Sequence, residues 1–408
     1  LYIRYIFNMS KLEELLKREC PDGVEWKKLG DIGRVAMCKR VMKAETEKEG
    51  DIPFYKIGTF GKKADAFISR ELFEEYRNKY SFPKKGDILI SASGTIGRTV
   101  IYDGEAAYYQ DSNIVWLEHD ESIILNKYLF YYYQLKPWNI TSGGTIQRLY
   151  NENIMNAKIQ IPPIEVQEEI VGILDTFTKY QDLLNRELEL RKKQYEYYRD
   201  KLLTFGDDVP LKKLGDIAID IYRGTGIKKD EVTEKGIPCV RYGEIYTKYN
   251  IWFDKCFSHT IEENIKNRKY FEYGDVLFAI TGESVKEISK SCVYIGHDKC
   301  LAGGDIVVLK HNQNPKYMGY VLSTTNAQIQ KSKGKVKSKV VHSNVQDISD
   351  ILIPVPPLEE QERIVNILDK FDALCNDITM GLPAEIEMRK KQYEYYRDKL
   401  LTFKEKKI

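Results

Sequence analysis

Large apolar side chains recur every three or four residues through the middle of the chain, from Val166 to Phe205. Glutamate, glutamine, lysine and arginine, which all favour helices, occupy most of the positions between them. This spacing predicts one long amphipathic helix with a heptad-like stripe and one local stutter. The stripe consists of Ile170, Ile173, Phe177, Tyr180, Leu184, Leu188, Tyr195, Tyr198, Leu202 and Phe205.

A second stripe of the same kind begins at Ile364 and is interrupted by Gly381-Leu382-Pro383. Proline removes a backbone donor and clashes with the preceding turn, so a kink or break is predicted there. Both predicted helices follow a Pro-Pro pair, which suits a helix start. The second stripe consists of Ile364, Ile367, Phe371, Leu374 and Ile378, followed by Ile386, Tyr393, Tyr396, Leu400 and Phe403.

The chain contains an internal repeat. The letters RKKQYEYYRDKLLTF occur at Arg191–Phe205 and again at Arg389–Phe403. Upstream, Ile161–Phe177 closely matches Val355–Phe371. Weaker matches, such as KKLGDI at residues 27–32 and 212–217, extend the repeat into the regions before each helix. The predicted order is therefore globular, helix, globular, helix.

Each helix needs a partner that covers its apolar stripe, and the simplest partner is the other copy. Near-identical stripes predict an antiparallel helix pair with a pseudo-two-fold axis and the globular domains at its opposite ends. The predicted helix–helix interface consists of Ile170, Ile173, Phe177, Leu184, Ile364, Ile367, Phe371 and Ile378.

The regions before the helices contain short apolar runs separated by glycine and aspartate, which is typical of mixed β-structure with some helix. The predicted fold class is therefore α+β: two mixed-β/α domains joined by two long antiparallel coiled-coil helices. Strands are predicted at Ile52–Ile57, Asp87–Ser91, Thr99–Tyr102, Asn113–Leu117, Val276–Ile280, Ser291–Ile295 and Asp305–Leu309, and helices at Asn126–Gln134 and Pro315–Ser323. The predicted domains are residues 1–160 (with an N-terminal segment 1–20), 161–205, 206–353 and 354–408.

Composition narrows the function classes. A net charge of +2 over 408 residues excludes a strongly basic tail protein and leaves room for local basic patches. The seven cysteines contain no C-x-x-C pair, so neither a disulfide framework nor a zinc site is predicted, and scattered thiols fit the cytoplasm. No apolar run reaches the roughly 18 residues of a membrane span. Leu1–Phe7 is too short for a signal peptide, and Met9 resembles a natural start, so residues 1–8 are expected to be upstream sequence.

Two segments that precede the helices are candidates for nucleic-acid contact. KSKGKVKSK at Lys331–Lys339 has lysine at every odd position, and an extended chain places such residues on one face, suited to phosphates. The corresponding earlier segment, Ser142–Tyr150, carries Gln147 and Arg148, residue types that can pair with base edges. The alternative for the lysine run is a solvated loop. The candidate residues are Gln147, Arg148, Lys331, Lys333, Lys335 and Lys337.

A second pair of segments follows the Gly-Asp strands, at Ser91–Arg98 and Ile280–Lys286. Glycine and hydroxyl groups allow close approach to a phosphate. The alternative is an ordinary β-turn. The candidate residues are Ser93, Thr95, Arg98, Thr281 and Lys286, and weaker candidates lie in Gly58–Lys63 and Arg241–Gly243.

The sequence does not indicate an enzyme. The Pro-Pro pairs open helices and are followed by Ile164 and Leu358, unlike the Asn/Asp-Pro-Pro-aromatic motif of adenine methyltransferases. A G-x-x-x-x-G-K-[ST] phosphate loop is missing, which argues against an ATP-driven motor. The five histidines are isolated in sequence. No catalytic residue, metal site or cofactor is predicted.

Several of these motifs resemble the specificity subunits of type I restriction-modification systems, the HsdS family. The resemblance rests on CPDGVEWKKLGD at residues 20–31, on the two P-P-[IL]-E-x-Q-E-x-I-V-x-I-L-D-x-F helix openings, and on Gly381-Leu382-Pro383 before RKKQYEYYRD. It covers almost the whole chain, and it is specific in the helices and weak in the globular regions.

The resemblance implies that each globular region is a target recognition domain that reads one half of a split double-stranded DNA sequence. It also implies that the helices bind two adenine-methyltransferase (M) subunits and that a translocating nuclease (R) subunit joins this core. The chain itself would then be a non-catalytic, cytoplasmic DNA-recognition subunit. A coiled-coil adaptor whose duplicated domains bind other proteins remains the alternative, and an enzyme is a distant third.

Overall fold

The computed structural model describes residues 2–139, 147–285, 287–332, 335–337, 340–377 and 380–406, with the backbone alone for residues 2–9, 335–337 and 340. The chain forms two compact units. Unit 1 consists of Leu1–Leu184 together with Ile386–Ile408, and unit 2 consists of Asn185–Glu385. Both units combine sheets with helices, so the predicted α+β class is confirmed.

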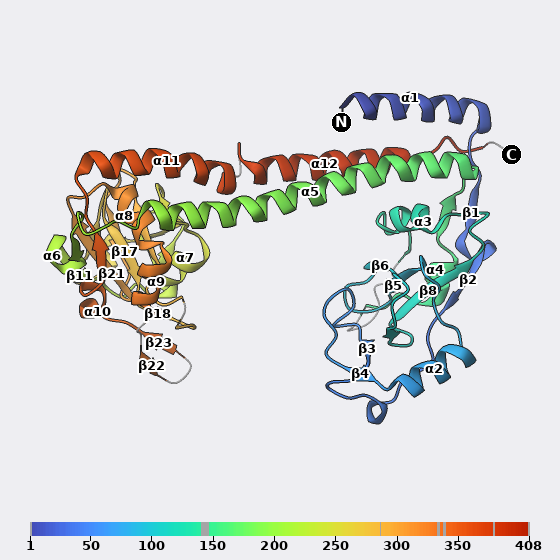
Figure 1. The fold of residues 1–408 in the computed structure, drawn as a ribbon, viewed down its shortest axis with the longest axis horizontal. Coiled ribbons are helices and arrows are strands. Elements are labelled where there is room, and N and C mark those ends of the chain that lie inside the picture. The colour runs from blue at the N-terminus through green and yellow to red at the C-terminus, as the bar shows by residue number, and fades with distance from the viewer. Residues whose placement is uncertain are drawn as a thin grey trace. The chain divides into compact units, whose positions relative to one another are not determined.

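Unit 1 is built on a four-stranded and a three-stranded sheet (Figure 1). In order across the first sheet are β2 (Gly33–Ala36), β8 (Ile114–His119), β5 (Ile88–Ser91) and β6 (Thr99–Ile101); across the second, β4 (Phe67–Ile68), β3 (Ile52–Tyr55) and β7 (Tyr108–Tyr109). A ribbon pairs β1 (Trp26–Lys28) with β9 (Lys158–Gln160). The helices are α1 (Tyr2–Glu19), η1 (Leu29–Asp31), η2 (Lys43–Glu45), α2 (Arg70–Lys79), α3 (Asn126–Tyr133), α4 (Asn151–Met155), the first part of α5 (Ile164–Leu202) and most of α12 (Leu382–Leu400).

Unit 2 contains two five-stranded sheets. The first sheet has the strand order β11 (Ala218–Arg223), β21 (Ile306–His311), β17 (Val276–Ala279), β19 (Ser291–Tyr294) and β14 (Trp252–Phe253). The second has the order β12 (Val232–Thr233), β15 (Ser258–Thr260), β13 (Ile237–Val240), β20 (Cys300–Ala302) and β16 (Tyr270–Phe271). A smaller sheet joins β18 (Thr281–Gly282), β23 (Val340–His342) and β22 (Lys335–Lys337), and β10 (Leu211–Lys213) pairs with β24 (Leu352–Pro354). The helices are α6 (Leu214–Ile217), η3 (Lys229–Glu231), α7 (Tyr242–Thr247), η4 (Glu262–Asn264), α8 (Pro315–Leu322), α9 (Thr325–Lys331), α10 (Val345–Ser349), α11 (Leu358–Asn376) and the last part of α5.

The two units repeat the same sheet topology. The order β2-β8-β5-β6 of unit 1 recurs as β11-β21-β17-β19, and β4-β3-β7 recurs as β15-β13-β20. In each unit one parallel pair joins the second sheet, β3 with β7 and β13 with β20. The internal repeat predicted from short matches therefore extends into both globular regions, although few side chains agree and unit 2 adds strands such as β12, β14 and β16.

The strands and helices predicted within the globular regions are confirmed to within a few residues, from β3 through α8. The long helix predicted from the apolar stripe is also confirmed as α5. The interruption at Gly381-Leu382-Pro383 separates α11 from α12. A Cβ atom on Gly381 would lie 2.4 Å from the carbonyl oxygen of Ala373, so only glycine fits this break.

Antiparallel helix packing occurs in each unit and obeys the repeat. In unit 1, Phe177 of α5 stacks on Tyr396 of α12 with ring centroids 5.6 Å apart. In unit 2, Tyr198 of α5 stacks on Phe371 of α11 at 5.8 Å. These are repeat-equivalent partners with their roles exchanged: Phe177 corresponds to Phe371, and Tyr198 to Tyr396. Arg389 lies over the Tyr180 ring, which confirms that α12 runs opposite to α5.

The predicted helix-interface residues contact the globular domains as well as another helix. Ile170 and Ile173 are buried in a cluster that holds Tyr393 and Leu400 of α12, and that cluster also contains α3 and the four-stranded sheet. Ile364 is buried in the matching cluster of unit 2. The stripe therefore packs on its own globular domain as well as on a helix. Of the other predicted interface residues, Leu184 is buried, Phe177, Ile367 and Phe371 are half-buried, and Ile378 lies outside the described residues.

A duplicated joint fixes each globular domain to its helix. In unit 1 the Tyr131 hydroxyl donates to Asp175 of α5 at 2.6 Å, and Lys127 forms an ion pair with the same carboxylate. In unit 2 the Tyr320 hydroxyl and the Lys316 ammonium bind Asp369 of α11 at 2.7 and 2.6 Å. The same three residue types thus hold both domains in one orientation on their helices.

A buried glutamine completes each joint. The Gln167 side chain accepts from the Leu125 amide at 2.9 Å and donates to the carbonyls of Ile123 and Pro162. Gln361 accepts from the Asn314 amide at 2.9 Å and donates to the Pro356 carbonyl and to Gln313. Both glutamines are fully buried. Each accepts a hydrogen bond from the N-cap amide of a neighbouring helix, Leu125 of α3 or Asn314 of α8, which has no partner within that helix.

Unit 1 is closed by residues from distant parts of the chain. Leu12 and Leu15 of α1 join the core that holds Leu400 and Leu401, and Arg18 of α1 pairs with Glu165 of α5. The buried Gln160 amide donates to the carbonyls of Val24 and Phe403 and accepts from the Phe403 amide at 2.9 Å. Residues 403–406 therefore belong structurally to the domain that begins with α1.

Candidate nucleic-acid interface

The first candidate segment of unit 1 is a tight turn after β5. The Ser91 hydroxyl accepts from the Arg98 amide at 2.9 Å and donates to the Thr95 carbonyl at 2.5 Å. Gly97 has φ +78°, and a Cβ there would lie 2.9 Å from the Trp138 ring. The turn therefore requires glycine at position 97. It leaves Thr95 exposed, while Arg98 is half-buried and donates to the Phe60 carbonyl at 3.0 Å.

The second candidate segment of unit 1 lies directly against this turn. The Leu149 amide donates to the Ala92 carbonyl at 2.8 Å, and Ser93 forms a β-bridge with Arg148. The Arg148 guanidinium donates to the Ser112 carbonyl at 2.9 Å, while Gln147 is exposed. We call residues 92–98, 111–113 and 147–149 the loop edge of unit 1. Three separate segments of the sequence thus form one surface.

Unit 2 has the same arrangement, which we call its loop edge: residues 280–285, 303–305, 335–337 and 340–343. The Ser343 amide donates to the Ile280 carbonyl at 2.9 Å, and the Ile280 amide donates to the Asp305 carbonyl at 3.0 Å. These bonds match those of Leu149 to Ala92 and of Ala92 to Asn113. Thr281 pairs with His342 in a ladder, and its largely buried hydroxyl lies 3.3 Å from His342 Nδ1.

The lysine run of unit 2 is divided among different elements. Lys335 and Lys337 lie on β22, which pairs with β23, so positions 335 and 337 share one face of an extended strand as the alternation requires. Lys286 and Lys333 lie outside the described residues. Lys331 ends α9 and is 5% exposed, so it is not on the surface that was predicted to meet DNA.

The Lys331 ammonium is used inside unit 2. It donates to the Ser291 hydroxyl at 2.8 Å and to the Leu322 carbonyl at 2.6 Å. This carbonyl is at the end of α8, where the helix dipole favours a cation. Desolvation lowers the pKa of Lys331 to about 7. The residue therefore fixes the end of α9 to α8 and β19.

Replacing Lys331 by methionine is expected to remove a pH dependence of stability. The unfolded lysine stays protonated up to its ordinary pKa of 10.5, while the folded one loses its proton near 7. Between these values the unfolded state binds more protons, so the unfolding free energy of unit 2 rises with pH, by about 4 kcal/mol from pH 7 to 10. The facing Cys292 thiol, whose pKa is raised to about 12 by burial, stays neutral over most of this range.

Denaturant titrations of the full chain at successive pH values would measure this dependence, with the unit 2 transition assigned by hydrogen exchange. Lys228→Met, at an exposed lysine, should keep the wild-type slope. A Lys331→Met chain with the same slope as Lys228→Met would contradict the burial of this ammonium in solution.

A hollow of about 410 Å³ adjoins the loop edge of unit 2 and contains the weaker candidate Arg241. Asp305, which accepts from Arg223 at 2.6 Å, belongs to both the hollow and the loop edge. The Lys248 ammonium lies 4.3 Å from the centre of the Phe257 ring at its rim. Sequence reasoning missed Lys248 and Phe257, because no local pattern links them to the loop edge.

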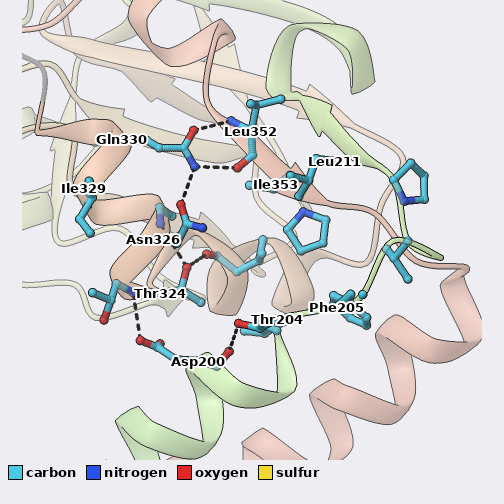
Figure 2. Close-up of a pocket in the computed structure, with 18 of the residues that line it drawn as sticks. Asp200, Thr204, Phe205, Leu211, Thr324, Asn326, Ile329, Gln330, Leu352 and Ile353 are labelled. Carbon is cyan, nitrogen blue, oxygen red and sulfur yellow. Dashed lines mark hydrogen bonds between the residues drawn. The ribbon is translucent and has the colours of Figure 1, made fainter.

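A larger hollow of about 980 Å³ lies elsewhere in unit 2, between the end of α5, the 206–211 connection, α9 and β24 (Figure 2). Gln330 bridges the backbone of Leu352 through two hydrogen bonds of 2.8 and 2.9 Å. Leu211, Ile329 and Leu352 at its border are exposed apolar side chains. Such a wall is suited to contact with protein rather than with nucleic acid.

Within the described ranges, no group of three histidine, cysteine, aspartate or glutamate side chains is arranged to hold a metal ion. In the same residues no helix is both long and apolar enough to cross a bilayer.

Comparison with known proteins identifies the class. The family model for the type I restriction modification DNA specificity domain matches residues 21–191 and again residues 207–388. The two matches together cover most of the chain, so the chain belongs to that family. It is therefore a type I restriction-modification specificity protein with two recognition domains.

Individual relatives agree with this assignment. The chain is 31% identical to the Escherichia coli type I restriction enzyme EcoR124I/EcoR124II specificity subunit over 97% of both proteins. It is 61% identical to a putative type I restriction enzyme specificity subunit of Haemophilus influenzae, over 43% of this chain and about half (47%) of that relative. A solved chain from work on complex assembly and conformational transition of the type I restriction-modification system has the same fold, with a TM-score of 0.63, 14% identity, and coverage of 93% of this chain and 97% of that one.

Proposed function

We propose that the chain reads a bipartite double-stranded DNA target, with one half-site per recognition domain, and holds two adenine-methyltransferase subunits and a restriction subunit in one complex. The chain contributes recognition and assembly and performs no catalysis itself. We place this function in the cytoplasm, where the seven free thiols would stay reduced.

The loop edges carry this proposal. Each unit brings the segment after its Gly-Asp strand against the segment before its long helix through equivalent backbone bonds. Two backbone hydrogen bonds are equivalent in both loop edges, while the residues that they position differ: Ser93, Gln147 and Arg148 in unit 1, and the β22–β23 hairpin with its lysines in unit 2. Equal frames with different side chains suit two readers of different sequences.

The scaffolding role is supported by other surfaces. Exposed apolar side chains border the large hollow of unit 2, where protein contact is favourable. The helices also keep exposed apolar and aromatic residues, such as Leu183, Leu190 and Tyr197 of α5 and Tyr395 of α12. These residues lie on the helices that the family resemblance assigns to the methyltransferase subunits.

Genome-wide mapping of methylated adenines, with and without the gene, tests the proposal. The expected result is a motif of two constant parts separated by a degenerate spacer of fixed length, which disappears when the gene is deleted. The double variant Gln147→Ala/Arg148→Ala should relax one part of the motif and leave the other part and the spacer unchanged. An uninterrupted motif, or relaxation of both parts together, would contradict one half-site per domain.

The adaptor alternative makes a different prediction in solution. A DNA reader with its methyltransferase partner binds mixed-sequence DNA with an affinity that falls steeply as salt rises. An adaptor protein lacks this dependence, so salt titration of DNA binding distinguishes the two functions.

A further inference from the structure

Two cysteines that lie far apart in the sequence come together in unit 2. Cys256 lies between β14 and β15, and Cys300 begins β20. Their sulfur atoms are 3.3 Å apart, with Cys256 as donor. Both are free thiols; Cys300 is fully buried and Cys256 is half-buried.

We propose that Cys256 and Cys300 form a reversible disulfide when the protein meets a peroxide. A disulfide needs the sulfurs about 2.05 Å apart, so they must approach by a little more than 1 Å. The half-buried sulfur of Cys256 is the one that a small oxidant can reach, and the buried sulfur of Cys300 lies directly behind it.

The backbone around the pair holds both thiols in place. The Phe257 amide donates to the Tyr249 hydroxyl at 2.7 Å, and the Ile295 amide donates to the Phe253 carbonyl at 2.8 Å, which fixes the loop that carries Cys256. Cys300 is opposite Phe271 in the β16–β20 pair. The loop that carries Cys256 and the strand that begins at Cys300 thus hold the two sulfur atoms 3.3 Å apart.

The chemistry balances with hydrogen peroxide as the oxidant. The Cys256 thiol is oxidised to a sulfenic acid, and one water is released. The Cys300 sulfur then attacks the Cys256 sulfur and displaces hydroxide, which takes up the proton lost by Cys300 to give a second water.

The position of the pair connects it to the loop edge of unit 2. Phe257 follows Cys256 directly, and Gly303 and Gly304 follow the strand that Cys300 begins. All three residues line the 410 Å³ hollow that also contains Arg241 and Lys248. A disulfide would therefore link the two chain segments that supply these lining residues, beside the proposed DNA surface.

The direct test is peptide mapping of the full wild-type chain. The reduced protein is treated with hydrogen peroxide, its remaining thiols are alkylated under denaturing conditions, and it is digested without reductant. We expect a Cys256–Cys300 linked peptide that disappears after treatment with dithiothreitol. The peptide with the partly exposed Cys20 of unit 1 should be recovered alkylated and unlinked. If Cys256 and Cys300 are both recovered alkylated, or are linked to other cysteines, the inference is wrong.

A second measurement tests the effect on recognition and depends on the proposed function. With the methyltransferase partner present, oxidation should lower the affinity for target DNA several-fold, reversibly, and a Cys256→Ser chain should keep its affinity under the same treatment. A linked peptide with unchanged affinity would separate the disulfide from DNA reading. If the reduced protein binds no DNA at all, the proposed function is contradicted, while the inference that Cys256 and Cys300 form a disulfide still stands.

Discussion

Gln361→Ala will destabilise unit 2 by about 3 kcal/mol, because it leaves several buried backbone and side-chain groups without partners. The lost bonds are those to the Asn314 amide, the Pro356 carbonyl and Gln313. Gln167→Ala should have an effect of similar size on unit 1, where the Leu125 amide loses its acceptor. Each substitution is expected to act within its own unit.

Hydrogen exchange followed by mass spectrometry can measure the two effects in one full-length chain. Protection should fall in α8 and the start of α11 for Gln361→Ala, and in α3 and the start of α5 for Gln167→Ala. Asn366→Ala removes an exposed amide from the same helix as Gln361 and should leave protection unchanged. Equal loss of protection in both units after either glutamine substitution would contradict two independent joints.

Replacing Lys335 and Lys337 together by alanine will weaken DNA binding roughly tenfold at physiological salt and reduce the slope of log affinity against log salt by about 2. The two positions share a face of β22, so both charges can meet one phosphate backbone. Phosphate contacts carry little sequence information, so the methylated motif should stay the same.

Salt titrations of the chain in complex with its methyltransferase partner would provide this slope. Lys228→Ala/Lys229→Ala removes the same charge from another part of unit 2 and serves as the matched control. If both double variants change the slope equally, only net charge matters and the hairpin has no specific role. An altered motif in the Lys335/Lys337 variant would assign base reading to β22.

The long helices were predictable because periodicity is a local property. The apolar stripe defines α5 by itself, and Gly381-Leu382-Pro383 defines the break before α12 by backbone sterics. By contrast, α1 was not predicted as a helix, because Leu12 and Leu15 are isolated apolar residues in a mainly charged segment. Only the fold shows that they pack against α5 and α12.

The candidate site was partly predictable for the same reason. The repeat paired segments 91–98 with 280–286 to within one residue. It paired 142–150 with 331–339, whereas the equivalent backbone bonds match Leu149 with Ser343, so this pairing was out of register. Only the fold shows that the two segments of each unit touch. Lys331 shows the limit of an alternation argument: the lysine series begins in α9 before the strand starts, so its first member points to the end of α8 instead of following β22. The proximity of Cys256 to Cys300 depends on sheet pairing across more than forty residues and has no local signal.

The way in which unit 1 closes has a consequence for synthesis on the ribosome. Its core needs Leu400 and Leu401, yet all of unit 2 is translated between Leu184 and Ile386. At about 5–20 residues per second, Ile170 and Ile173 wait on the order of ten to forty seconds for that partner. Unit 1 is thus the first recognition domain to be translated and the last to be completed. A stop codon within α12 would therefore damage unit 1, even though residues 1–184 had been translated correctly.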